Sequence, residues 1–333
     1  MYGVRGMACD YAVVVVTYNR LKLLKECLEQ VEDQTTPAKR IIVVNNASED
    51  GTTEYLQECK ERNPYYRVIT CAENTGGAGG FAKGIEAAAE EKTECILLID
   101  DDAILAGDYM EKIMAARQHY PDYKAYAGAV MTNGRIDIYH RRNMVRPGLM
   151  MKNCPENCYT GDKVGQPFAC DIASFCGMVI DRELIGKVGF PCGDYFLWFD
   201  DTEYSIRINR HTRFLVIPDA QLDHKTMANV RQYPHRRYDW REYYGIRNRI
   251  MCVKRHGNLL DRAVNGADMF CRIIFRNWLF GMIHMDDYDW EYEKCLVREA
   301  YRDAGAKDNI RKGIPVFDKV HAQKTWRGAR LQK

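Results

Sequence analysis

Three consecutive carboxylates, Asp100, Asp101 and Asp102, follow the apolar run Cys95–Ile99. An apolar run of this length is typical of a strand that is buried on both faces. The three acids would repel one another unless a cation lies among them. Carboxylates are natural ligands of Mg²⁺ and Mn²⁺, and such ions usually share their coordination with substrate phosphates. The pattern therefore predicts a divalent cation that holds a phosphate-bearing substrate.

The geometry of a strand divides the three acids, and a histidine is available further along the chain. Because side chains alternate along a strand, we expect Asp100 and Asp102 to project to one side and Asp101 to the other. His224, which follows the predicted strand 213–217, is a candidate third metal ligand, although a single histidine is more often structural. The spacing of Cys154, Cys158, Cys170 and Cys176 is not a usual zinc pattern, so we expect buried thiols there.

A second acidic cluster, Asp200, Asp201 and Glu203, follows the aromatic run Phe196–Phe199. A carboxylate in apolar surroundings has a raised pKa and can act as a general base. The alternative is the N-terminus of a helix, where the helix dipole favours acids. The position of the cluster downstream of a metal-type motif favours the catalytic interpretation.

A glycine-rich segment lies between the third predicted strand and the next helix. Gly77–Ala82 fits the pattern G-x-G-x-x-A of dinucleotide-binding proteins, and Asp100 lies about 20 residues further on. The segment follows the third strand rather than the first, and no Lys-Ser/Thr pair makes it a P-loop. We interpret the glycines as allowing the backbone to approach a sugar or a diphosphate. A turn that binds no ligand stays open as the alternative.

Strands that alternate with helices must position these residues. Apolar runs predict strands at 13–16, 40–44, 66–71 and 95–99, with helical spacing between them and Asn19 as the N-cap of the first helix. This alternation predicts an α/β fold with a mostly parallel central sheet flanked by helices. Ligands of such sheets bind beyond the carboxyl ends of the strands, where the polar segments after each strand would meet.

The rest of the chain is less regular. Residues 140–170 are predicted to be a long loop region, and 172–180 and 213–217 to be further strands. From Tyr238 onward the pattern is mainly helical. We therefore expect a first domain at 1–235, with a nucleotide half at 10–130 and an acceptor half at 131–235, and a helical C-terminal region at 236–333.

Composition limits the class of protein. The 333 residues are 46% hydrophobic and 28% charged, and no apolar run reaches the roughly 20 residues that span a bilayer. The first ten residues lack the apolar core of a signal peptide, so we expect a cytoplasmic protein whose 13 cysteines are mostly reduced.

Charge is distributed unevenly along the chain. Residues 1–224 carry 25 Lys and Arg against 33 Asp and Glu, whereas residues 225–333 carry 23 against 13. The basic part could face phosphates or the cytoplasmic face of a membrane, and Cys271–Phe280 mixes arginines with large apolar side chains as an interfacial helix does. An ordinary solvated surface and an oligomer contact are the alternatives. The sequence contains no recognised nucleic-acid module, so we expect no nucleic-acid partner.

The order of these motifs resembles the family-two glycosyltransferases, which bind nucleotide sugars with a GT-A fold. The resemblance covers about residues 11–250, and its downstream part is most similar to bacterial galactofuranosyltransferases, with rhamnosyltransferases sharing most of the layout. The matching segments are Val15-Val16-Thr17-Tyr18-Asn19, Asn46-Ala47-Ser48-x-Asp50-Gly51, Asn74-x-Gly-Gly-Ala-Gly-Gly, Asp100-Asp101-Asp102-Ala103, Trp198-x-Asp200-Asp201-x-Glu203-Tyr204, His224 and Tyr243-Tyr244-x-x-Arg247-Asn248-Arg249.

The resemblance implies a role for each matching position. It implies Asp100, Asp102 and His224 as ligands of Mn²⁺ or Mg²⁺, and Asp201 as the catalytic base with Asp200 in support. The implied nucleotide-binding residues are Thr17, Tyr18, Asn19, Asn45, Asn46, Asn74, Gly77 and Asp101, and the implied acceptor-binding residues are Trp198, Phe175 and Glu203. The chain departs from the family at two positions, with Asn45 and Glu203 where aspartates are usual.

The resemblance implies an inverting, metal-dependent transfer of a sugar to a cell-surface glycan or a polyprenyl-linked acceptor. UDP-galactofuranose is the first donor that we expect, and dTDP-rhamnose is the second. Two functions of other classes stay open from the sequence: a nucleotide-dependent oxidoreductase, which only the G-x-G-x-x-A segment favours, and a non-catalytic protein that binds nucleotide sugars. Self-association into a homo-oligomer is also open.

Overall fold

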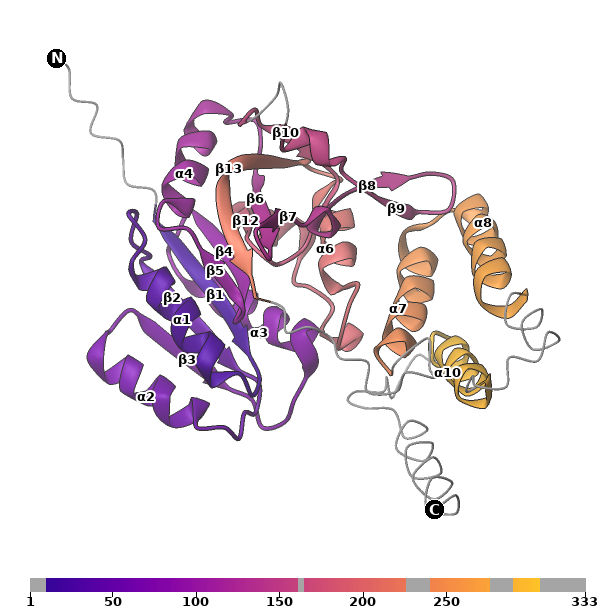
Figure 1. The fold of residues 1–333 in the computed structure, drawn as a ribbon, viewed down its shortest axis with the longest axis horizontal. Coiled ribbons are helices and arrows are strands. Elements are labelled where there is room, and N and C mark those ends of the chain that lie inside the picture. The colour runs from indigo at the N-terminus through magenta and orange to yellow at the C-terminus, as the bar shows by residue number, and fades with distance from the viewer. Residues whose placement is uncertain (1–9, 161–164, 226–239, 276–289, 306–333) are drawn as a thin grey trace. The chain divides into compact units, whose positions relative to one another are not determined.

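The structure is a computed structural model that describes residues 10–160, 165–225, 240–275 and 290–305 (Figure 1). The chain forms two compact units. The first contains residues up to 143, 152–193 and 201–227, and the second contains 144–151, 194–200 and the chain from 228 onward. The domain boundary predicted at 235 lies outside the described residues and stays a prediction.

The first unit is built around one large sheet with the strand order β10-β13-β6-β12-β4-β1-β2-β3. Strands β4, β1, β2 and β3 are parallel neighbours, as are β6 and β13, whereas β12 and β10 run antiparallel to their partners. The predicted α/β class with a mostly parallel sheet is therefore confirmed. The strands are β1 (Tyr11–Thr17), β2 (Arg40–Asn45), β3 (Tyr66–Thr70), β4 (Cys95–Asp100), β5 (Ala103–Leu105), β6 (Ala125–Thr132), β7 (Arg135–Ile136), β10 (Phe168–Cys170), β12 (Met178–Asp181) and β13 (Phe214–His224).

Helices cover both faces of this sheet (Figure 1). Val13 and Val15 of β1 face α1, α2 and α4, whereas Val14 and Val16 face α3, α5 and α6, because side chains alternate along a strand. Burial on both faces explains why the central strands are continuous apolar runs. The helices are α1 (Leu21–Glu32), α2 (Thr52–Arg62), α3 (Gly76–Glu90), α4 (Tyr109–His119), α5 (Arg182–Val188) and α6 (Asp200–Ile208).

The region between β6 and β13 differs from the prediction. Residues 140–170 are not one long loop, because they contain β8 (Arg141–Val145), β9 (Met150–Asn153) and β10. The predicted strand 172–180 is two strands, β11 (Ile172–Ala173) and β12, separated by a turn with Gly177 at φ 79°. Strands β11, β8 and β9 form a second sheet. Short 3₁₀ turns lie at Ile138–His140, Glu156–Cys158 and Gly193–Tyr195.

Two helix starts and one strand end also differ. Helix α3 begins at Gly76, so most of the predicted glycine loop forms its first turns. Asn19 is not the N-cap of α1, because Arg20 occupies that position and the Asn19 amide oxygen accepts a hydrogen bond from the Glu49 N–H. Strand β13 continues past an irregularity between Ile217 and Gln221 and ends at His224, which therefore lies on a strand and not beyond one.

The described part of the second unit is mainly helical, as predicted for the C-terminal region. Tyr243 and Tyr244 of α7 pack with Leu296 and Ala300 of α10 in a separate apolar core. The helices are α7 (Arg241–His256), α8 (Leu259–Met269), a π-helical turn at Phe270–Phe275 and α10 (Trp290–Asp303). Among the described residues, no helix is both long enough and apolar enough to cross a bilayer.

Candidate functional site

The three acids lie at the carboxyl end of the central strand β4. Asp100 is the last residue of the strand, and Asp101 and Asp102 form the turn that leads into β5. The alternation expected for the three side chains therefore stops at Asp100. One guanidinium contacts both later acids, because Arg20 Nη1 lies 3.2 Å from Asp101 Oδ1 and 2.6 Å from Asp102 Oδ2.

Strand pairing brings two residues from far along the chain to Asp100. Met178, the first residue of β12, pairs with Leu98 of β4, and Cys176 lies in the turn directly before it, near the end of β4. His224 pairs with Ala103 of β5, directly after the acids.

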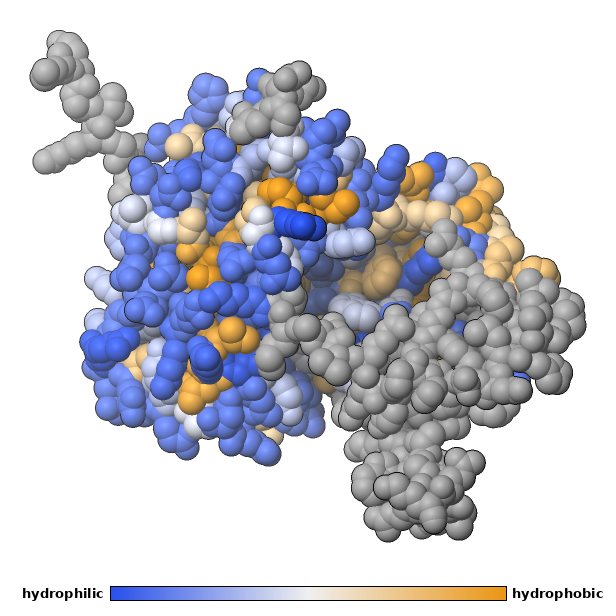
Figure 2. Space-filling view, in the orientation of Figure 1, coloured by the Kyte–Doolittle hydropathy of each residue, from blue (hydrophilic) through white to orange (hydrophobic). Residues whose placement is uncertain are grey.

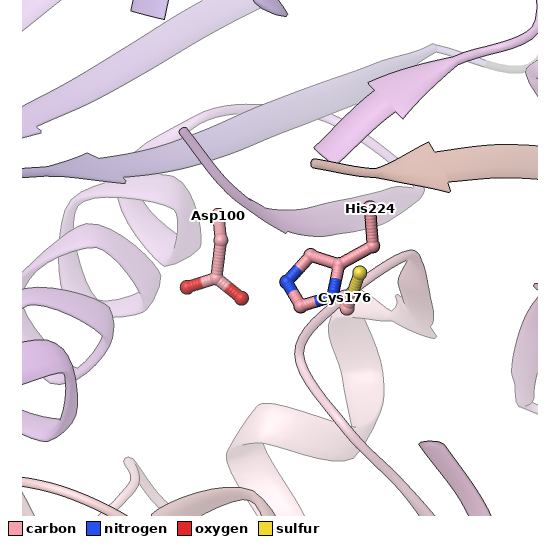
Figure 3. A group of neighbouring side chains, drawn as sticks. All are labelled: Asp100, Cys176 and His224. Atoms are coloured by element: carbon pink, nitrogen blue, oxygen red, sulfur yellow. The ribbon is translucent and has the colours of Figure 1, made fainter. Parts of the chain in front are cut away.

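The resulting group consists of Asp100, Cys176 and His224 (Figure 3). A carboxylate oxygen of Asp100, the sulfur of Cys176 and a ring nitrogen of His224 all lie within 4.8 Å of one another. In the view of Figure 3, the imidazole lies between the carboxylate and the sulfur. We refer to these three residues as the Asp–Cys–His group.

Burial makes the acids resist ionisation. Burial, and then the charge of Asp102, raises the pKa of Asp100 to about 7. Burial also raises the pKa of Asp101 to about 6, although the positive charge of Arg20 and the hydrogen bond from the Thr17 hydroxyl act in the opposite direction. When all three acids are ionised, their charge exceeds that of the two neighbouring cationic side chains, Arg20 and His224.

Asp102 and His224 stabilise each other as an ion pair, with Asp102 Oδ1 lying 3.3 Å from His224 Nε2. Burial alone would raise the pKa of Asp102, but the contact with His224 and the charge of Arg20 outweigh burial and lower it. Burial alone would lower the pKa of His224, but Asp102 and Asp100 outweigh burial and raise it.

One buried polar atom at this end of β4, His224 Nδ1, has no hydrogen-bond partner. Asp102 Oδ1, which is also buried, contacts His224 Nε2 through the ion pair. A buried polar atom without a partner costs free energy, so such atoms mark places where an ion or a water is expected. Together with the Asp100 carboxylate, these atoms are suitable ligands for a divalent cation, and a cation would also balance the excess negative charge. The residues present therefore fit a divalent metal ion.

Of the predicted nucleotide-binding residues, several hold the loops at the carboxyl edge of the sheet. The Thr17 hydroxyl donates to Asp101 Oδ2 at 2.7 Å. The buried Asn46 amide donates to Asn74 Oδ1 at 3.0 Å and accepts from the Thr75 N–H at 2.9 Å. Asn45 is fully buried and donates to the Thr53 hydroxyl at 2.9 Å. These contacts order the rim of the site, and nucleotide binding by these residues stays a prediction.

Tyr18 is a more exposed member of the same rim. Its side chain is 44% exposed, so it can reach a bound molecule without displacing a packing contact. Asn19, next to it, is exposed at φ 53°, and its backbone N–H donates to the Ser48 hydroxyl at 3.0 Å. Tyr18 and Asn19 also stay predictions as nucleotide-binding residues.

The glycines of α3 differ in how much space surrounds them. A Cβ at Gly80 would lie 2.4 Å from Val16 Cγ1, and a Cβ at Gly84 would lie 2.3 Å from Val14 Cγ1. These glycines allow α3 to pack closely against β1, so a role in approaching a ligand is not needed to explain them. Gly77 is different, because a Cβ there would meet nothing within 4 Å.

The predicted base, Asp201, lies in the first turn of α6. Its Oδ1 atom accepts hydrogen bonds from the backbone and the hydroxyl of Thr202, and its Oδ2 atom lies 3.8 Å from Arg142 Nη2. The side chain is about one-fifth exposed, at 20%. The carboxylate is thus held in place and can still be reached from solvent.

The remaining residues predicted near the acceptor are mostly buried. Glu203 is 1% exposed and pairs with Arg207 at 2.8 Å, and Phe175 is 3% exposed and packs on Phe81 with ring centroids 4.5 Å apart. Trp198 is 42% exposed and Asp200 is buried. The environments of Glu203 and Phe175 are typical of packing residues, and the acceptor contacts predicted for all of them stay predictions.

The segment that leads to Asp200 has a strained backbone. Phe196, Trp198 and Phe199 have φ angles of 63°, 62° and 68°, which cost bulky residues of the order of 1–3 kcal/mol each. Asn248 of α7 stabilises this conformation, because its amide nitrogen contacts the carbonyl oxygens of residues 195, 197 and 198 at 2.8–2.9 Å. Backbone strain of this kind is concentrated at functional segments.

Sequence reasoning missed Cys176 and Arg20 as members of the site. The spacing of the cysteines groups Cys176 with three others, although Gly177 directly after it indicates a turn at a strand end. No pattern in the sequence indicated Arg20, because its partners lie about 80 residues away and the contact depends on the sheet.

Comparisons with known proteins match this architecture. At 33% identity, the chain is similar to the uncharacterized glycosyltransferase YwdF of Bacillus subtilis, over 63% of this chain and 72% of that protein. It is 22% identical to the dTDP-rhamnosyl transferase RfbF of Shigella flexneri, over 75% of this chain and 82% of RfbF. The match to EpsH of Bacillus subtilis, at 33% identity, covers 31% of this chain and 29% of EpsH.

Solved structures share the fold. The structure of GalNAc-T7 with UDP, GalNAc and Mn²⁺ is 16% identical with a TM-score of 0.59, over 74% of this chain and 48% of that one. The predicted GT-A fold is therefore confirmed. The model of the family described as "Glycosyl transferase family 2" matches residues 12–189, which is more than half of the chain. The chain thus belongs to glycosyl transferase family 2.

Proposed function

We propose that this protein transfers a sugar from a nucleotide-sugar donor to a glycan acceptor with inversion at the anomeric carbon. The observation that carries this proposal is the convergence of Asp100, Asp102 and His224 at the carboxyl end of β4, where the buried His224 Nδ1 has no hydrogen-bond partner. Ligands of α/β sheets bind at this edge. Family membership supports the reaction class, and the GT-A fold supports a nucleotide-sugar donor.

A divalent ion, Mn²⁺ or Mg²⁺, would be held by Asp100 and His224, with Asp102 beside them. Such an ion supplies charge that stabilises a departing nucleoside diphosphate. The GalNAc-T7 structure contains Mn²⁺ and UDP, which supports an ion of this kind. Arg20 keeps Asp101 and Asp102 in place from the other side, so that the carboxylates are oriented before a donor binds.

Asp201 is proposed to accept the proton of the acceptor hydroxyl as that oxygen attacks the anomeric carbon. The hydrogen bonds from Thr202 orient Oδ1, and Oδ2, which lies 3.8 Å from Arg142 Nη2, is the oxygen proposed to receive the proton. The proton of the acceptor hydroxyl must be taken up by a group on the acceptor side of the site, whereas the departing diphosphate is stabilised by cations. We therefore assign proton transfer to Asp201 and charge stabilisation to the acids at the end of β4.

The donor has two candidates. UDP-galactofuranose comes first because of the resemblance around Trp198–Tyr204, and dTDP-rhamnose comes second because RfbF, the relative matched over 82% of its length, is named as a dTDP-rhamnosyl transferase. The acceptor is proposed to be a cell-surface glycan, including glycans on a polyprenyl carrier, reached from the cytoplasm. The acidic sheet edge disfavours a polyanionic acceptor such as nucleic acid.

A thermal-shift panel tests the donor and the metal together. We expect UDP or dTDP to raise the melting temperature only with Mn²⁺ or Mg²⁺, and one of the two sugar nucleotides to raise it further, because binding to the folded state stabilises it. EDTA should abolish both the shift and sugar transfer. Full transfer activity in excess EDTA would contradict a metal-dependent reaction.

A further inference from the structure

Cys176 is the one member of the Asp–Cys–His group that the proposed transfer does not use. Cys176 lies in the turn directly before β12, and the pairing of Met178 with Leu98 fixes that turn next to the carboxyl end of β4. Two further contacts hold its backbone: the carbonyl oxygen accepts from Arg141 Nη2 at 2.9 Å, and the next residue, Gly177, donates to the Leu98 carbonyl oxygen at 3.0 Å.

The space around this turn is fully occupied, so the cysteine has little freedom to move. A Cβ at Gly177 would lie 2.4 Å from Leu222 Cδ2 and 2.6 Å from the Tyr109 hydroxyl. That hydroxyl donates to the Gly177 carbonyl oxygen at 2.6 Å. The sulfur of Cys176 is therefore presented to Asp100 and His224 by a rigid backbone, as a preorganised ligand would be.

A reactive, nucleophilic thiol would need different surroundings. Nucleophilic cysteines are partly exposed and lie in electropositive environments that favour the thiolate. Cys176 is 1% exposed and lies beside the carboxylate of Asp100. A thiol that is buried in this way is out of reach of a substrate, whereas a bound cation would convert a coordinating thiol to its thiolate. The surroundings therefore favour a metal ligand over a nucleophile.

The donor atoms decide which cations the group prefers. Mg²⁺ is bound by oxygen ligands and keeps much of its water, whereas thiolate and imidazole ligands favour Zn²⁺, Co²⁺ and related ions. One carboxylate, one imidazole and one thiolate together form a donor set known for zinc.

We propose that Cys176 is a third protein ligand of the Asp100–His224 centre, so that this centre binds thiophilic divalent cations more tightly than Mg²⁺. This inference rests on the proposed function only in that a divalent cation binds at Asp100 and His224. On binding, the thiol loses its proton to solvent and the sulfur contacts the ion directly. Zn²⁺ then competes with Mn²⁺ for the centre.

Cobalt and cadmium are the probes, because a thiolate bound to either ion gives a charge-transfer absorption band that oxygen and nitrogen ligands do not give. The purified full-length protein is titrated with Co²⁺ and with Cd²⁺, and absorption and calorimetric affinity are measured together. The variants are Cys176→Ser, His224→Ala and the matched control Cys27→Ser. Cys27 is also buried and lies near β4, with its sulfur 3.7 Å from the Asp100 carbonyl oxygen, but it is not part of the group.

The expected result is a band in the wild type and in Cys27→Ser that is absent from Cys176→Ser and from His224→Ala. Loss in both variants shows that the band comes from this centre and not from another cysteine. Loss of an outer-shell partner typically lowers metal affinity by roughly 10- to 100-fold. We expect Cys176→Ser to lower the affinity for Cd²⁺ by at least this factor. Its effect on Mg²⁺ binding should be much smaller, because Mg²⁺ prefers oxygen. If Cys176→Ser does not fold by circular dichroism, Cys176→Ala replaces it.

Two other outcomes would overturn the inference in distinguishable ways. If Co²⁺ binds in a manner that needs His224 but the band is unchanged in Cys176→Ser, Cys176 is not a ligand, and the proposed function is unaffected. If neither Co²⁺, Cd²⁺ nor Mn²⁺ binds to the wild type, both this inference and the metal role in the proposed transfer are wrong.

Discussion

Individual side chains at the end of β4 are arranged to balance charge. Asp100, Asp101 and Asp102 would repel one another in a buried position, and two cationic side chains reduce that repulsion. Arg20 contacts two of the acids, and His224 contacts Asp102. These two side chains thus provide part of the positive charge that the sequence predicted among the three acids. When all three acids are ionised, these two side chains balance two of the three negative charges.

At the scale of a residue, the sharpest test of the mechanism is Asp201→Asn. The amide keeps the shape of the side chain but cannot accept the proton of the acceptor hydroxyl. We expect turnover to fall by about 10²- to 10⁴-fold, the usual contribution of a general base, with donor affinity unchanged. Steady-state kinetics and calorimetric titration with the nucleotide measure the two quantities separately.

The control for this substitution is Asp108→Asn, because Asp108 precedes α4 and pairs with Lys112 on the surface. This variant should keep full turnover. If Asp201→Asn loses donor binding rather than turnover, Asp201 belongs to the donor site and is not the base.

At the scale of elements, the site depends on how closely α3 packs against β1. Helix α3 carries the Gly-rich segment, and β1 ends at Thr17, which bonds to Asp101. The close approach exists because Gly80 and Gly84 have no side chains to separate the two elements. Gly80 lies within the segment Gly77–Ala82 that fits a dinucleotide-binding pattern, and its position against Val16 shows that it is needed for packing.

Gly84→Ala is expected to destabilise the protein by about 1–3 kcal/mol, the usual cost of overpacking, because the new methyl group overlaps with Val14. Urea unfolding followed by circular dichroism measures this as a lower midpoint with an unchanged slope. The matched substitution in the same helix is Gly77→Ala, which meets nothing within 4 Å and should change stability by no more than about 1 kcal/mol. Equal losses in the two variants would refute the packing role.

At the scale of the whole molecule, acidic and basic residues are separated along the chain. The first 224 residues have a net charge of −8, and the rest have +10. In the second unit, hydrophobic residues gather on the surface over α8 (Figure 2), where Leu259 is 82% and Leu260 is 59% exposed. Exposed apolar side chains are typical of a surface that binds lipid, and the basic last turn of α7, Lys254–His256, lies directly before α8 in the chain. Part of the segment Cys271–Phe280, predicted to lie at a membrane, is outside the described residues.

We therefore predict that the protein binds to anionic vesicles at low salt through α8. The double variant Leu259→Glu/Leu260→Glu should lose most of this binding, because it removes apolar area and adds negative charge. Flotation with phosphatidylserine-containing and purely zwitterionic vesicles measures it, and high salt should reduce it by screening. Tyr65→Glu, a substitution of an exposed aromatic residue in the first unit, is the control. Flotation of the wild type and the double variant to the same extent would argue against α8 as the contact.

Much of the fold could be predicted because its signals are local. The runs at Val13–Val16 and Cys95–Ile99 are apolar since their strands are covered on both faces, and a strand with this burial is recognisable in any context. The polar segments after each strand could be placed together because parallel strands share one carboxyl edge. The start of α3 at Gly76 and the length of β13 could not be predicted from the sequence. Packing, and not local propensity, determined both.

The sequence by itself determined that three acids end a central strand and that a histidine and a second acidic cluster follow. These features depend on residue types and on short spacings along the chain. Only the tertiary structure decided that Arg20 contacts Asp101 and Asp102 and that Cys176 lies with Asp100 and His224. The physical reason is that β12 runs antiparallel beside β4, and the register of that pairing depends on the whole sheet rather than on the residues near Cys176.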